Sequence, residues 1–73
     1  MRNPDRLDNF YKDWALLHKK YFPDWRKGQL DSNFYGWLYN NKKVDMFFPE
    51  EAKMLEYFRE YCEVMNPQGD DHE

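Results

Sequence analysis

The chain has 73 residues, a net charge of −3 at pH 7 and a single cysteine, Cys62. One cysteine excludes an internal disulfide, and one cysteine with two histidines argues against a four-ligand zinc site. A single domain of this length lies near the lower limit for folding without such staples. Aromatic residues make up 21% of the chain, so we expect ring packing to supply the stability.

The first helix is predicted over residues 4–20. Asn3 is a favoured N-cap, and Pro4 suits the first helical position. Apolar and aromatic side chains then recur at steps of three and four, which is typical of one helix face. They are Leu7, Phe10, Tyr11, Trp14, Leu17, His18 and Tyr21.

The second helix is predicted over residues 24–40. Pro23 disfavours helical backbone at Phe22 and suits the first turn of a new helix. Its apolar stripe comprises Leu30, Phe34, Trp37 and Leu38. Gly28 and Gly36 each cost about 1 kcal/mol inside a helix, so we expect them to allow close approach of a neighbouring backbone.

The third helix is predicted over residues 49–65, after Pro49. Its expected buried line is Leu55, Phe58, Cys62 and Met65. Phe22, Phe47 and Phe48 are expected to pack the corners between helices. With no Ile and two Val, strands are disfavoured. The prediction is an all-α three-helix bundle over residues 1–66 with a flexible acidic tail over 67–73.

No combination of residues indicates catalysis. Cys62 lies on the apolar line, where a thiol behaves as a small hydrophobe. His18 borders the first helix's apolar face, and His72 lies in the tail. There is no glycine-rich phosphate loop or His-Glu metal pair. We therefore expect no enzyme activity, no cofactor and no metal.

The fifteen aromatic residues exceed what so short a bundle is expected to bury. Tyr and Trp are enriched at protein-binding hot spots, which predicts a partner-binding or self-association surface, with a homodimer as one form. Acidic side chains of the third helix would steer a basic partner. The predicted set is Trp25, Tyr35, Tyr39, Glu56, Tyr57, Glu60, Tyr61 and Glu63. Alternatively, the rings wrap a small core with their hydroxyls in water.

A helical DNA-binding regulator is the second functional hypothesis. Its contact residues would be Arg26, Lys27, Lys42 and Lys43. Residues 1–43 hold nine Lys and Arg against five Asp and Glu, whereas residues 44–73 hold two against nine. In an antiparallel bundle the basic residues gather at two ends and not in one stripe, and the third helix is acidic, which disfavours groove binding.

Three phrases, RNPDRLDNF, FPDWRKGQL and FFPEEAKMLEYF, resemble small uncharacterised proteins of phages and prophages of Gram-positive bacteria. The likeness covers about residues 2–62, and PDWRKGQL is its most specific part. The resemblance implies a protein that modulates or inhibits a host protein, such as a defence or regulatory factor, and carries no site residues. No membrane span or signal peptide is evident, so the expected location is the cytoplasm of the host.

Overall fold

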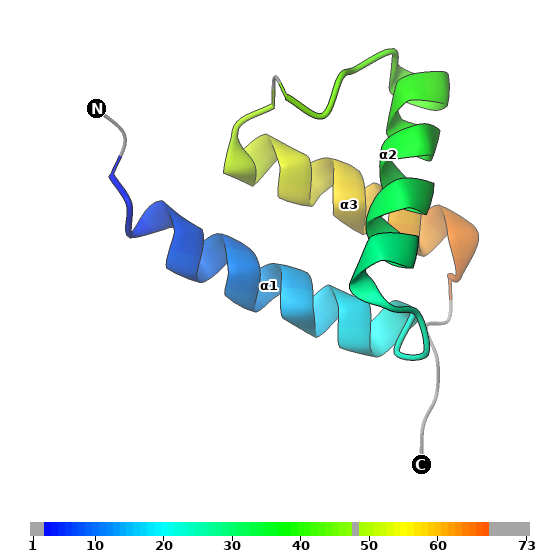
Figure 1. Cartoon of the computed structure of the whole chain (residues 1–73), viewed down its shortest axis with the longest axis horizontal. Helices are drawn as coiled ribbons and strands as arrows, with labels where there is room; N and C mark the ends of the chain where they lie inside the picture. The colour runs from blue at the N-terminus through cyan, green and yellow to red at the C-terminus, as the bar shows by residue number, and fades with distance from the viewer. Residues whose placement is uncertain (1–2, 48, 68–73) are drawn as a thin grey trace.

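The computed structural model describes residues 3–47 and 49–67, and within them it contains three helices and no strand. They are α1 (Arg6–Tyr21), α2 (Lys27–Lys42) and α3 (Glu51–Met65), shown in Figure 1. The predicted all-α three-helix bundle is confirmed. Phe48 and the predicted tail beyond Pro67 lie outside the described residues.

The prolines lie in the turns before the helices and not in the first helical turns. At the start of α1 the Asn3 side chain accepts a hydrogen bond from the Asp5 backbone N–H at 2.9 Å, and a tight turn through Pro4 leads into Arg6. Pro23 lies in a separate turn, and α2 begins only at Lys27, later than predicted.

Aromatic stacking holds this turn between α1 and α2. The Trp25 ring stacks on the Phe22 ring with centroids 4.3 Å apart, and the Trp25 backbone N–H donates to the Phe22 carbonyl. His18 contacts the Trp25 carbonyl through Nε2 at 2.8 Å, a structural role. Phe22 is buried, so the prediction that it packs a corner is confirmed.

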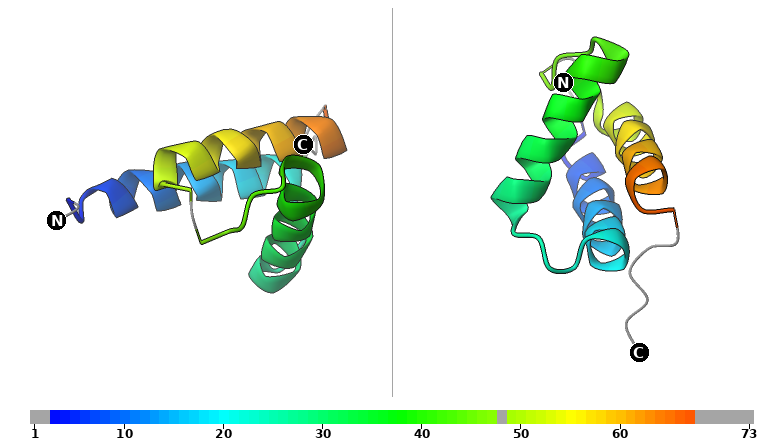
Figure 2. Two further views of the ribbon diagram at one scale, coloured as in Figure 1. Left: turned by 90° about the horizontal axis from the view of Figure 1, so that it is seen from above. Right: turned by 90° about the vertical axis from the view of Figure 1, so that its right-hand side faces the viewer.

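Helices α1 and α3 lie side by side and run in the same direction, whereas α2 crosses them steeply (Figures 1 and 2). The first and third helices of an antiparallel three-helix bundle also share a direction, so the departure from that arrangement is the steep crossing of α2. Arg6 Nε lies 2.7 Å from Glu51 Oε1 where α1 and α3 begin. Where they end, the Asn66 side-chain amide donates to the Tyr21 carbonyl at 2.8 Å. The parallel pair is thus joined at both ends.

One ring from each helix meets at the centre of the core. Trp14 of α1 stacks on Phe58 of α3 at 3.9 Å between centroids and meets Phe34 of α2 edge-on at 5.7 Å. The fully buried side chains around them are Leu30, Leu38 and Cys62. Each aromatic pair stabilises the fold by about 0.5–1.5 kcal/mol beyond the contribution of its buried area. The observed core therefore agrees with the expectation that ring packing supplies the stability.

The buried face of α3 is rotated relative to the prediction. Its members are Met54, Phe58, Tyr61 and Cys62. Met65 is exposed and Leu55 half-buried, so the predicted line was wrong at these positions. Tyr61, predicted to bind a partner, is only 3% exposed. It packs on Phe22 and Trp37 because α2 crosses this part of α3, and it is a core residue.

The glycines of α2 do not mark a close helix contact. A Cβ placed on Gly28 or Gly36 would meet nothing within 4 Å. The prediction of close backbone approach is wrong, because both positions face solvent.

Candidate partner-binding groove

Exposed aromatic and apolar side chains gather where α2 diverges from α1. Tyr35 of α2 lines a set of three hollows; Phe10 also lines two of them, and Met46 and Phe47 line two. We call this the aromatic groove. Its principal members are Phe10 and Tyr11 of α1, Tyr35 and Tyr39 of α2, and Met46 and Phe47 of the connection to α3.

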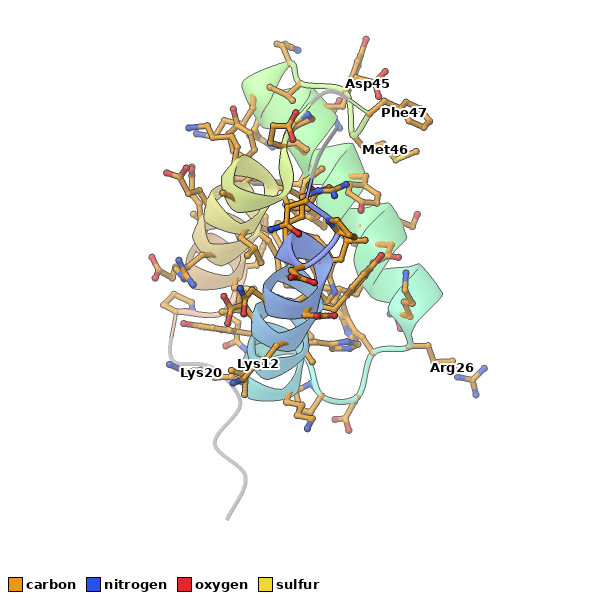
Figure 3. The ribbon with its side chains drawn as sticks, turned by 90° about the vertical axis from the view of Figure 1, so that its left-hand side faces the viewer. Lys12, Lys20, Arg26, Asp45, Met46 and Phe47 are labelled. Carbon is orange, nitrogen blue, oxygen red and sulfur yellow. The ribbon has the colours of Figure 1, made fainter. Side chains whose placement is uncertain are left out.

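The outer end of the aromatic groove is formed by the connection after α2. Lys43 ends the helix in a left-handed conformation with φ of 57°, and the Asp45 side chain accepts a hydrogen bond from the Phe47 N–H at 3.0 Å. This turn presents Met46 and Phe47 outward, as Figure 3 shows. Phe47 is 80% exposed, so the prediction that it packs a corner is wrong.

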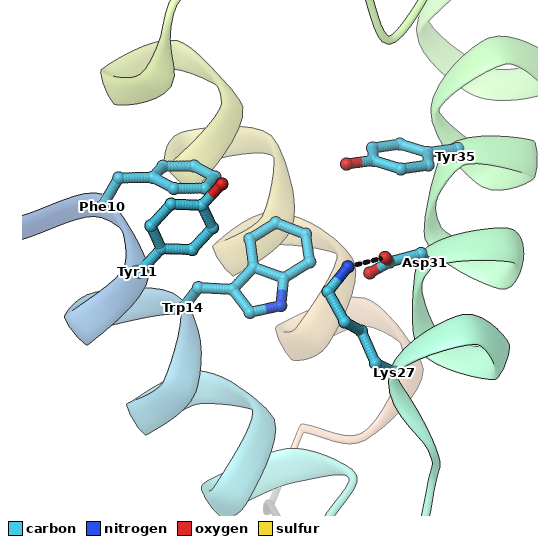
Figure 4. Close-up of a pocket in the computed structure, with 6 residues that line it drawn as sticks. All are labelled: Phe10, Tyr11, Trp14, Lys27, Asp31 and Tyr35. Carbon is cyan, nitrogen blue, oxygen red and sulfur yellow. Dashed lines mark hydrogen bonds and ion pairs between the residues drawn. The ribbon is translucent and has the colours of Figure 1, made fainter. Parts of the chain in front are cut away.

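The inner end of the aromatic groove is a cavity of about 120 Å³ between α1 and α2. Phe10, Tyr11 and Trp14 form one wall, and Tyr35 points its hydroxyl toward them from the other (Figure 4). Lys27 and Asp31 of α2 line the cavity on the same side as Tyr35, with Lys27 Nζ 2.5 Å from Asp31 Oδ2. The cavity thus combines aromatic rings with one ion pair.

The ion pair sets the electrostatics of this cavity. The hydrogen bond and charge of Asp31 raise the pKa of Lys27, which keeps its ammonium protonated. Burial, and then the Asp31 carboxylate, raise the pKa of Tyr35. Tyr35 therefore remains a neutral hydroxyl at physiological pH and offers both a donor and an acceptor.

The structure brings together only part of the predicted partner-binding set. Tyr35 and Tyr39 lie in the aromatic groove, and Tyr39 is 62% exposed. Trp25 is half-buried on the α1–α2 turn, away from the groove. Tyr57 is half-buried on α3 beneath the Lys53 ammonium, 5.1 Å from its ring centroid.

The acidic residues of the predicted set also do not form one surface with the tyrosines. Glu56 and Glu63 are exposed on α3. Glu60 forms an ion pair with Lys42 of α2 at 2.8 Å, so it contributes to helix packing.

Tyr11, Met46 and Phe47 belong to the groove but were missing from the predicted site. The sequence could have indicated Met46 and Phe47, because the loop sequence VDMFFPE is too apolar for an ordinary solvent-exposed connection. The position of Tyr11 beside Tyr35 depends on how α2 crosses α1, which local sequence does not encode.

The four residues predicted for DNA binding lie at opposite ends of α2. Arg26 and Lys27 are at its start, and Lys42 and Lys43 are at its end. Lys27 pairs with Asp31, and Lys42 pairs with Glu60. Two of the four cations are therefore partly neutralised, and Arg26 projects far from the other end of α2 (Figure 3).

Three further observations concern metal-binding groups, the Cys62 thiol and the length of the helices. The described residues contain no group of three His, Cys, Asp or Glu side chains placed to hold a metal ion. Burial raises the pKa of the Cys62 thiol to about 12, so its thiolate is scarce at neutral pH. Over the same residues, no helix combines the length and apolar character that crossing a lipid bilayer requires.

Comparisons with protein-family models, curated proteins and solved structures found no match to this chain.

Proposed function

We propose that this chain is a non-enzymatic binding protein that holds a segment of a partner protein in its aromatic groove. The observation that carries the proposal is the exposure of Tyr11, Tyr39, Met46 and Phe47 around hollows that share Tyr35 as a lining residue. A contiguous exposed apolar patch on a small domain is typical of an interaction site. Tyr, Phe and Met are also enriched in interface cores.

The phage-like phrases of the sequence supply the biological setting of the proposal. The partner is a host protein, for example a defence or regulatory factor, which the chain modulates or inhibits in the host cytoplasm. The exposed Glu56 and Glu63 on α3 would favour approach of a basic partner surface, an effect expected mainly on the association rate.

A capture experiment with matched variants tests the proposal. Immobilised protein is incubated with lysate of a Gram-positive host, and retained proteins are identified by mass spectrometry. The Tyr39→Ser/Phe47→Ser variant removes two exposed rings from the groove. The control, Leu16→Ser/Val64→Ser, removes two similarly exposed apolar side chains elsewhere.

We expect the groove variant to lose a specific partner that the control retains. Equal retention by both variants would contradict a binding role for the groove. Circular dichroism of each variant shows whether its helices are intact.

Self-association is a further form of the same proposal, in which a second copy covers the groove. Light scattering at high concentration measures it: a dimer that the groove variant abolishes supports this form, and a monomer mass removes it.

The DNA-binding alternative has less support because its cations are divided between the ends of α2. No electrophoretic shift at salt below about 50 mM would end it.

A further inference from the structure

The inner cavity of the aromatic groove contains an unsatisfied acceptor. Asp31 Oδ2 is paired with Lys27, but Asp31 Oδ1 is buried and has no hydrogen-bond partner. An unpaired buried acceptor costs free energy, so a donor that reaches it gains more than an ordinary surface hydrogen bond. Asp31 lines the cavity together with Trp14 and Tyr35, but Oδ1 itself has almost no accessible surface, so a donor from outside reaches it only after a neighbouring side chain has moved.

We propose that this cavity binds the guanidinium group of an arginine side chain from the partner, which donates to Asp31 Oδ1 while lying against the aromatic walls. The inference rests on the proposed function and names the chemistry that the groove recognises at its inner end.

The surroundings of Asp31 favour a cation over an anion or a neutral group. Aromatic rings carry negative potential on their faces and attract cations placed over them. The cavity is lined by four rings, one carboxylate and the Lys27 side chain; the rings are those of Phe10, Tyr11, Trp14 and Tyr35. The cavity has room for a group of several heavy atoms.

Arginine fits the cavity better than lysine. Guanidinium is flat, stacks on aromatic faces and is more weakly hydrated than ammonium, so it loses less on leaving water. Its several N–H groups allow one to reach Asp31 Oδ1 and another the Tyr35 hydroxyl, which points into the same space.

The Lys27 ammonium competes with the incoming guanidinium for the Asp31 carboxylate. Its ammonium already holds Asp31 Oδ2, yet its side chain is 78% exposed and comes from the first turn of the same helix. Exposed pairs at this helical spacing are weak. When guanidinium enters, the Lys27 ammonium moves into solvent, and its charge reduces the affinity of the site.

The test titrates the full chain with Nα-acetyl-arginine amide and follows the indole N–H resonance of Trp14 by NMR. We expect saturable binding with a dissociation constant of order 10 mM for this single side chain. The lysine analogue should bind more weakly. The citrulline analogue, which has nearly the same shape without charge, should bind at least about fivefold more weakly.

Two variants that break the same ion pair should have opposite effects. Asp31→Asn should weaken arginine binding by about tenfold, because the carboxylate is lost. Lys27→Gln should tighten it by about threefold, because the competing cation is lost. A purely structural role of the ion pair would move both variants in the same direction.

Further variants separate charge from folding. Lys27→Gln/Asp31→Asn should bind arginine more weakly than Lys27→Gln alone. Asp24→Asn, which removes an exposed acid from the α1–α2 turn, should bind as the parent chain does. Equal binding of citrulline and arginine, or unchanged binding by Asp31→Asn, would overturn the inference.

Failure of this inference is distinguishable from failure of the proposed function. If arginine does not bind but Tyr39→Ser/Phe47→Ser loses a captured partner, only the guanidinium site is wrong. If arginine binds as expected but the groove variant captures every protein that the control does, the cavity stands and the partner-binding role fails.

Discussion

Helix α1 has two neighbouring helices, α3 and α2, and it packs against them in different ways. Toward α3 it presents Trp14, which stacks on Phe58, and this interface is joined at each end by Arg6–Glu51 and Asn66–Tyr21. Toward α2, beyond their shared core, it leaves an open cavity that contains an ion pair and an unsatisfied carboxylate oxygen.

The two interfaces show how a chain this short separates stability from recognition. Rings that meet at the centre of the bundle are removed from water and hold the helices together. Rings of the same chemical kind along the α1–α2 opening stay exposed, because the steep crossing of α2 carries it away from α1. Variants at the two places should therefore affect different measurements.

Phe58→Ala should cause the largest change. Its ring is fully buried between Trp14 and Phe34, and truncating a buried Phe costs about 3–5 kcal/mol. That is a large fraction of the stability of a small domain, so helical circular dichroism should be lost or melt far below the parent. Phe47→Ala is the matched control: its ring is 80% exposed, and we expect a change within about 0.5 kcal/mol. Equal destabilisation by the two variants would contradict the division between core and groove.

Alkaline pH should lower the free energy of unfolding through Cys62, which is fully buried in the core. Burial raises the pKa of its thiol from 9.0 to about 12, so the folded state favours the neutral thiol. This contribution to the free energy of unfolding is fully present below pH 9 and is lost as pH rises from 9 toward 12. Each unit of pKa difference corresponds to about 1.4 kcal/mol.

Urea unfolding at stepped pH measures this loss, and Cys62→Ala should lessen the alkaline slope. The native thiol should also resist a maleimide at pH 7.5 and react once urea is added. Rapid labelling of the native protein would show that the Cys62 thiol is accessible to the reagent and not buried.

The helices and most of the core could be predicted from local sequence. The stripe of Leu30, Phe34 and Leu38 is buried as its spacing indicates, because helical periodicity depends on nearby residues. The start of α2 was misplaced because Pro23 occupies the second position of a turn, a position that proline also favours, and this turn is closed by the Trp25 backbone N–H and the stacked rings of Phe22 and Trp25.

The functional surface was predictable only in part, because it depends on how helices cross. Tyr35 and Tyr39 were correctly seen as neighbours on one helix. Tyr61 follows the same one-turn spacing from Tyr57, but α2 covers it. Spacing identifies residues that share a face, whereas the direction of a neighbouring helix decides whether that face meets protein or solvent.

Asn66→Ala should produce an intermediate effect by releasing one end of the α1–α3 pair. Its amide bonds the Tyr21 carbonyl at 2.8 Å across 45 residues of sequence. Loss of one such hydrogen bond costs about 1 kcal/mol, measured as a lower urea midpoint. Asn41→Ala is the control, since its amide bonds the Trp37 carbonyl within α2 and joins no two helices. If the two variants lose the same stability, the bond to Tyr21 has no special role in joining the pair.

Gly36→Ala should give the smallest change and the opposite sign. Gly36 lies inside α2 on a solvent-facing side, and an added Cβ meets nothing within 4 Å. Alanine restricts the unfolded chain and favours helix, so the free energy of unfolding should rise by about 0.5–1 kcal/mol, seen as a higher urea midpoint. Because Gly36 is not among the residues that line the groove or form the core, arginine binding measured at Trp14 should not change. A stability gain accompanied by altered arginine binding would mean that α2 changes its shape during recognition. The stacked core and the aromatic groove would then be coupled through this helix.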